Sequence, residues 1–123
     1  MAIKIGNIIQ AKAATVARTD TTDKAVFTLP ANAMVIGIEA FGVNSDSATS
    51  ATLTFKSRPT DGSTAAASFG TINAKATANG ATQATLTGIA YARQSTPQYI
   101  TAVYSEVGAA TTGGSWTFIV KYL

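Results

Sequence analysis

Apolar and polar residues alternate along most of the chain in short runs, the pattern of half-buried β-strands. The closing run, residues 115–123, is the clearest case. Its large apolar side chains occupy every second position, and they are expected to share one buried face: Trp116, Phe118, Val120 and Tyr122. Residues 51–57 repeat the pattern, and Leu53 and Phe55 are expected to point inward. Alternation of this kind predicts strands that cover a core with one side only.

Residues 34–43 form the strongest apolar run and are apolar on both sides of an extended chain. One face would carry Met34, Ile36, Ile38 and Ala40, and the other Val35, Glu39, Phe41 and Val43. A strand that is apolar on both faces is expected inside a sheet. Glu39 is the exception. We expect it to lie at a rim of the sheet or to pair with a base such as Lys56 or Arg58. The most specific form of this expectation is an ion pair between two subunits.

Further strands are predicted from similar runs at residues 10–17, 25–29, 65–73, 82–91 and 98–107. The Ala-rich run 10–17 also fits a short helix, but a strand is favoured. Turn residues separate these runs at 30–33 and 58–63, and a Gly-rich hairpin loop is expected at 108–114. About eight or nine short antiparallel strands without a helix predict an all-β fold, a β-sandwich or jelly roll.

The length of 123 residues fits one domain, residues 1–123, in which residues 1–10 form an extended arm or edge strand. Apolar residues make up 46% of the chain and charged residues only 12%, about half the usual share of roughly 25%. The surface must therefore consist mainly of hydroxyl-bearing and small side chains, or be partly buried in an assembly. The N-terminal run is too interrupted for a signal peptide, and no apolar stretch approaches membrane-spanning length.

The absence of histidine and cysteine excludes most catalytic chemistry. Histidine-based triads, thiol nucleophiles and zinc sites all need side chains that this chain lacks. Paired carboxylates remain, drawn from Asp20, Asp23, Glu39, Asp46, Asp61 and Glu106. A calcium loop at Asp20 and Asp23 lacks the usual ligand spacing, so an ordinary polar loop is the preferred interpretation. No catalytic residue, cofactor or metal is expected, and the protein is predicted not to be an enzyme.

The net charge is only +3, and the nine basic residues are scattered. Only Lys56 and Arg58 lie close together, so neither a nucleic-acid nor a membrane partner is predicted. The aromatic residues Trp116, Tyr91, Tyr99, Tyr104 and Tyr122 could form a platform for sugars. However, Trp116 shares strand parity with Phe118, which favours a place in the core or at a subunit interface.

Two stretches of the chain are distinctive. The first is Phe27-Thr-Leu-Pro-Ala-Asn-Ala-Met-Val-Ile-Gly-Ile-Glu-Ala-Phe-Gly-Val, a Leu-Pro turn leading into a long interior strand, and the second is the closing Gly113-Gly-Ser-Trp-Thr-Phe-Ile-Val-Lys-Tyr-Leu. Together they are similar to segments of tailed-bacteriophage capsid decoration (cement) proteins and related small virion proteins. The resemblance implies a β-sandwich or jelly roll, often a homotrimer, that binds the major capsid protein where capsid hexamers and pentamers meet.

The predicted function is therefore that of a structural virion protein, made in the host cytoplasm, on the outer capsid surface. Capsid contact is assigned to the arm isoleucines Ile3, Ile5, Ile8 and Ile9, and subunit contact to exposed strand faces near Phe41 and Tyr104. Deletion of residues 2–10 is expected to abolish capsid binding without unfolding the domain. Two alternatives remain. One is a carbohydrate- or receptor-binding module of a phage tail or baseplate, which an aromatic strip open to solvent would favour and burial of Trp116 would count against. The other is a ring-forming tail-tube or baseplate subunit.

Overall fold

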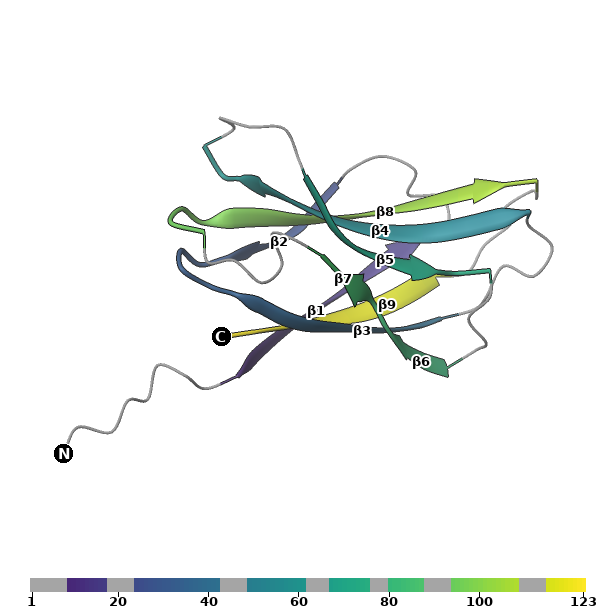
Figure 1. Cartoon of the computed structure of the whole chain (residues 1–123), viewed down its shortest axis with the longest axis horizontal. Coiled ribbons are helices and arrows are strands. Elements are labelled where there is room, and N and C mark those ends of the chain that lie inside the picture. Colours follow the sequence, from purple (N-terminus) through teal and green to yellow (C-terminus); the bar gives the residue numbers. More distant parts are fainter. Residues whose placement is uncertain are drawn as a thin grey trace.

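Two antiparallel sheets lie face to face in the computed structural model (Figure 1). The structure describes residues 9–17, 24–42, 49–61, 67–75, 80–87, 94–108 and 115–123. Within them the strands are β1 (Gln10–Ala17), β2 (Lys24–Leu29), β3 (Val35–Gly42), β4 (Ser50–Pro59), β5 (Ala67–Asn73), β6 (Gly80–Gln83), β7 (Thr85–Leu86), β8 (Gln98–Val107) and β9 (Ser115–Tyr122). The described residues contain no helix, hence none that could cross a membrane. The all-β prediction is confirmed.

The strand order identifies the sandwich as a jelly roll. One sheet has the order β1-β9-β3-β6 and the other β2-β8-β4-β5-β7. We call them the four-stranded and the five-stranded sheet. Most successive strands change sheet, while β4 and β5 follow one another as neighbours. This winding places the first and last strands side by side, because β1 and β9 pair over their whole length.

The core fills the space between the two sheets. The alternation predicted for β4 and β9 is confirmed, since Leu53, Phe55 and all four even-numbered residues of β9 are buried. Phe55 and Phe118 come from opposite sheets, and their rings meet edge to face with centroids 5.0 Å apart. The two sheets are thus joined by aromatic side chains at the centre of the sandwich.

A β-bulge in β3 makes the predicted face assignment partly wrong. The pairing of β3 with β9 shifts register between Val35 and Gly37, so Ile36 is an extra residue. Val35 and Ile38 are therefore both buried, although they were placed on opposite faces, and Ile36 is only half-buried. A bulge changes the side-chain parity of a strand, and sequence alternation alone does not reveal it.

Two connections differ from the sequence prediction. Within residues 82–87, the described part of the single strand expected over residues 82–91, the chain contributes to two short strands, β6 and β7, in different sheets. Residues 88–91 lie outside the described residues. Ala84 lies between them, and its backbone N–H donates to the carbonyl of Ile38 at 2.9 Å. The segment after Gly108 is not a hairpin loop, because β8 and β9 belong to different sheets.

The predicted turn at residues 30–33 is confirmed. Asn32 has a φ of 65°, and the Ala33 N–H donates to the Pro30 carbonyl at 3.2 Å. Asparagine tolerates this left-handed conformation better than most residues. The turn returns the chain from β2 in the five-stranded sheet to β3 in the four-stranded sheet.

Candidate interaction surface

The structure places the predicted contact residues in different environments. Ile9 immediately precedes β1 and is 60% exposed, and Phe41 near the end of β3 is 40% exposed. Tyr104 is fully buried, so its predicted position on an exposed face is wrong. It lies opposite Leu53 of β4, and both side chains point into the core. The other three arm isoleucines, Ile3, Ile5 and Ile8, lie outside the described residues.

Phe41 belongs to the outer side of the four-stranded sheet, a surface built mostly from small side chains. The pairing registers place Thr15, Thr117 and Phe41 in one row across β1, β9 and β3. The Oγ1 atoms of Thr15 and Thr117 are 3.3 Å apart. We call this surface the small-residue face and define it by Ala11, Ala13, Thr15, Thr117, Ile119 and Phe41. Because most of these side chains are short, the surface of another protein can approach this face closely.

One ion pair lies beside the small-residue face. The Nζ atom of Lys121 donates to Oε1 of Glu39 at 2.8 Å, and the two side chains are 38% and 36% exposed. Glu39 is paired with a base, as expected, but the base is Lys121 rather than Lys56 or Arg58, which lie on β4 in the other sheet. The pair neutralises the charges that β3 and β9 place on this side of the sheet.

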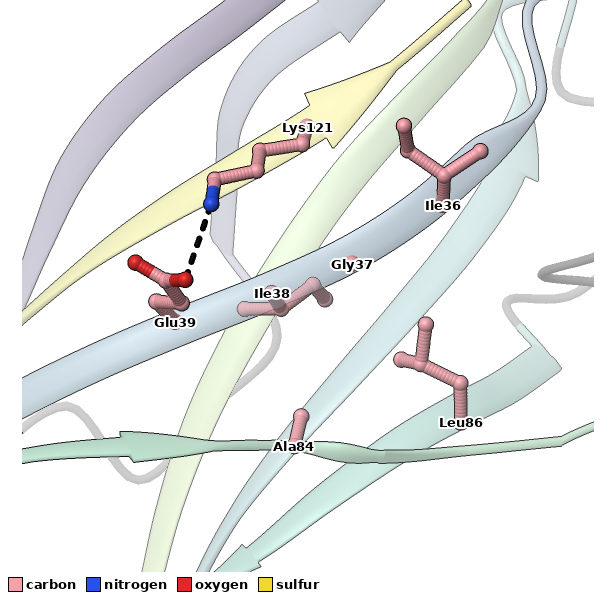
Figure 2. A pocket seen from close by; sticks show the side chains of 7 residues that line it. All are labelled: Ile36, Gly37, Ile38, Glu39, Ala84, Leu86 and Lys121. Carbon is pink, nitrogen blue, oxygen red and sulfur yellow. Dashed lines mark hydrogen bonds and ion pairs between the residues drawn. The ribbon is translucent and has the colours of Figure 1, made fainter.

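A shallow hollow of about 230 Å³ adjoins the ion pair. Figure 2 shows it between β3 and the Ala84–Leu86 segment, with Lys121 and Glu39 at one side. Its two charged residues bind one another, and its remaining lining is Ile36, Gly37, Ile38, Ala84 and Leu86. A small-molecule site usually has a few polar side chains that converge on the ligand, and the only charged side chains that line this hollow are paired with each other. Within the described residues, moreover, no three acidic residues gather as a metal site would require.

The outer side of the five-stranded sheet differs in chemistry. Its pairing rows bring together hydroxyl side chains such as Thr52, Thr54 and Thr71. Its bases are Lys56 and Arg58, and the guanidinium of Arg58 lies 5.7 Å from the centroid of the Tyr99 ring. Hydroxyl and charged groups of this kind are readily solvated.

The aromatic residues do not assemble a platform in the described part of the chain. Trp116, Tyr104 and Tyr122 are buried, which confirms the core interpretation of Trp116. Tyr99 is partly exposed, beneath Arg58. Tyr91 lies outside the described residues. The burial of Trp116 is the observation that was expected to count against a sugar-binding module.

Comparison with known proteins reveals similarity in structure. No family model matches the sequence, and no curated protein matches it. A chain in the cyanophage Pam1 capsid asymmetric unit superposes with a TM-score of 0.62 at 19% identity, covering 99% of this chain and 89% of that one. A chain in the acid-stable capsid of Helicobacter pylori bacteriophage KHP30 gives 0.57 at 13% identity, covering 94% of each chain. At these identities the similarity shows a shared fold, one that occurs in phage capsids.

Proposed function

We propose that this protein is a structural component of a phage virion that binds the outer capsid surface and strengthens contacts between capsid subunits. The observation that carries the proposal is the extent of the structural matches. Each covers about nine tenths or more of both chains. The matched capsid chains are therefore of similar size, and the shared fold accounts for nearly all of each.

The surface supports a binding rather than a catalytic role. The side of the four-stranded sheet that bears the small-residue face carries one neutralised ion pair, and the hollow beside it presents no free charged group among its lining residues. Surfaces with little charge resist association poorly. A modest contact of this kind gains strength when many copies bind a symmetric shell at once.

Two contacts complete the proposal. The arm, with Ile3, Ile5, Ile8 and Ile9, binds the major capsid protein by adding an extended segment to one of its sheets. Copies of the chain associate as a homotrimer through the small-residue face around Phe41. Tyr104 has no part in either contact because it is buried in the core.

Truncation of the arm tests the capsid contact. The deletion should remove residues 2–8 and keep Gln10, because Gln10 pairs with Tyr122 and its Oε1 accepts a hydrogen bond from the Tyr122 hydroxyl at 3.3 Å. We expect the truncated protein to keep the circular dichroism spectrum and melting temperature of the full chain. It should lose binding to shells of the phage that encodes it, prepared without this protein and examined by electron microscopy.

Matched variants separate the isoleucines from the rest of the arm. Replacement of Ile3, Ile5 and Ile8 by serine should abolish shell binding, whereas Lys4→Ser should retain it. Full decoration by the truncated protein would disprove the arm contact alone. Absence of the full-length chain from virion heads, tested with gold-labelled antibodies, would disprove the capsid role, and labelling of tails would support the tail-tube or baseplate alternative.

A further inference from the structure

The four sheet edges are not equally protected against pairing with another strand. Strands β6 and β7 are short, with four and two residues. Strand β2 has a register shift between Ala25 and Phe27, and the carbonyl of Thr28 accepts a hydrogen bond from Nζ of Lys12 at 2.7 Å. Short length, bulges and lysine side chains all protect natural edges.

Strand β1 is neither short nor bulged, and its single lysine side chain is held against the other sheet. It pairs with β9 over eight consecutive residues without a register shift, and no strand of the described part of the chain lies beyond it. Its sequence, Gln-Ala-Lys-Ala-Ala-Thr-Val-Ala, contains no proline. Its one charge, Lys12, is directed toward β2. Alternate residues of such an edge present backbone N–H and C=O groups that a further strand can pair.

We propose that β1 pairs antiparallel with β1 of a second copy, about a twofold axis at Ala13. The two four-stranded sheets would then form one continuous sheet. Ala11 would lie opposite the partner's Thr15, and Lys12 opposite the partner's Ala14. Ala11, Ala14 and Thr15 are small and uncharged and Lys12 meets an alanine, so the directly opposed residues make no like-charge contact.

Side-chain chemistry selects this register over its neighbours. A shift that places Lys12 opposite the partner's Lys12 would bring like charges together, which is destabilising. A shift by one residue would place inward side chains of one copy against outward side chains of the other.

This contact goes beyond the proposed capsid role and does not depend on it. It has twofold symmetry, so it differs from the contacts within a trimer. On a shell it would join copies that belong to neighbouring trimers. Such links would connect the decorating proteins to one another as well as to the capsid, and many weak links on one shell act together.

Cysteine cross-linking tests the register directly, because the chain has no cysteine of its own. Ala13→Cys places two thiols opposite each other across the axis, where directly opposed Cβ atoms lie roughly 4.5–5.5 Å apart. Thr71→Cys is the matched control, since Thr71 is exposed like Ala13 but lies on the outer side of the other sheet, where β5 is paired with β4 and β7 on its two sides. Under mild oxidation in solution, without shells, Ala13→Cys should form disulfide-linked dimers about tenfold faster than the control.

A charge substitution gives a second measurement that needs no covalent trapping. Ala13→Lys places two ammonium groups opposite one another at the axis, so sedimentation equilibrium should show weaker dimerisation than for Thr71→Lys. Equal cross-linking rates for the two cysteine variants, both with parental circular dichroism spectra, would overturn the proposal. That result would leave the capsid role intact, because shell binding is measured separately.

Discussion

The inner and outer sides of the four-stranded sheet are formed by the same strands but differ in the size and burial of their side chains. On β9 the inner side carries Trp116, Phe118, Val120 and Tyr122, all buried. The outer side of β9 carries Thr117, Ile119 and Lys121, which remain partly accessible. Strand β1 repeats the contrast, with Val16 buried and Ala13 exposed. Large side chains therefore hold the two sheets together from one side, and small side chains leave the other free for contacts.

This division gives the outer side freedom to change. Hydrophobic stabilisation scales with the apolar area removed from water, and on the inner side that area is large and already buried. The outer side contributes less to folding, so its residues can suit a partner at little cost to stability. Substitutions at neighbouring positions on opposite sides test this view most directly.

The largest expected effect comes from adjacent residues of β9. Phe118 is fully buried and packs edge to face against Phe55 of the other sheet. We expect Phe118→Ala to lower the free energy of unfolding by about 3–5 kcal/mol. Ile119→Ala, one residue away on the outer side, should cost about 1 kcal/mol or less. Urea denaturation of both variants measures the difference, and equal costs would contradict the division between the two sides.

A smaller effect is expected at two glycines of β3. A Cβ atom at Gly42 would lie 2.6 Å from Cδ2 of Trp116 and 2.7 Å from the Ser115 carbonyl oxygen. We expect Gly42→Ala to destabilise the fold by about 1–3 kcal/mol, because the backbone and the indole ring must separate.

Gly37 is the control for this prediction, since a Cβ there would have nothing within 4 Å. Gly37→Ala should be neutral or stabilising by up to about 1 kcal/mol, through reduced freedom of the unfolded chain. Thermal unfolding of the two variants gives the comparison. A Gly42→Ala variant as stable as Gly37→Ala would show that the Trp116 side of the sheet is loosely packed.

Local alternation predicted those strands in which one side is apolar and the other is not. It located β4 and β9 and the side of each that is buried. Alternation failed in β3, because a bulge at Ile36 changes which side of the strand the following side chains occupy. It also failed within residues 82–87 of the strand expected over residues 82–91, because the chain passes from one sheet to the other near Ala84. Bulges and crossovers depend on which strands are neighbours, and local sequence does not carry that information.

The predicted contact residues show the same limit of what local sequence can predict. Strand β8 is apolar on both sides, so alternation could not choose between them, and Tyr104 proved to be on the buried side. The partner of Glu39 depends on β9 lying next to β3, a pairing between segments far apart in sequence. The alternation of side chains along β9 was nevertheless enough to place Lys121 on the side of the strand opposite Trp116.

The smallest expected effect concerns this ion pair on the outer side. Lys121 and Glu39 are each more than one third exposed, so water and salt weaken their attraction. A double-mutant cycle with Glu39→Gln and Lys121→Met should give a coupling energy of about 0.2–1 kcal/mol, falling as salt is raised. A coupling well above that range, unchanged by salt, would place the pair in a desolvated environment and make the outer side a structural surface like the inner one. A small coupling would leave the pair with a different effect, that of keeping charge balanced on the outer side of the four-stranded sheet.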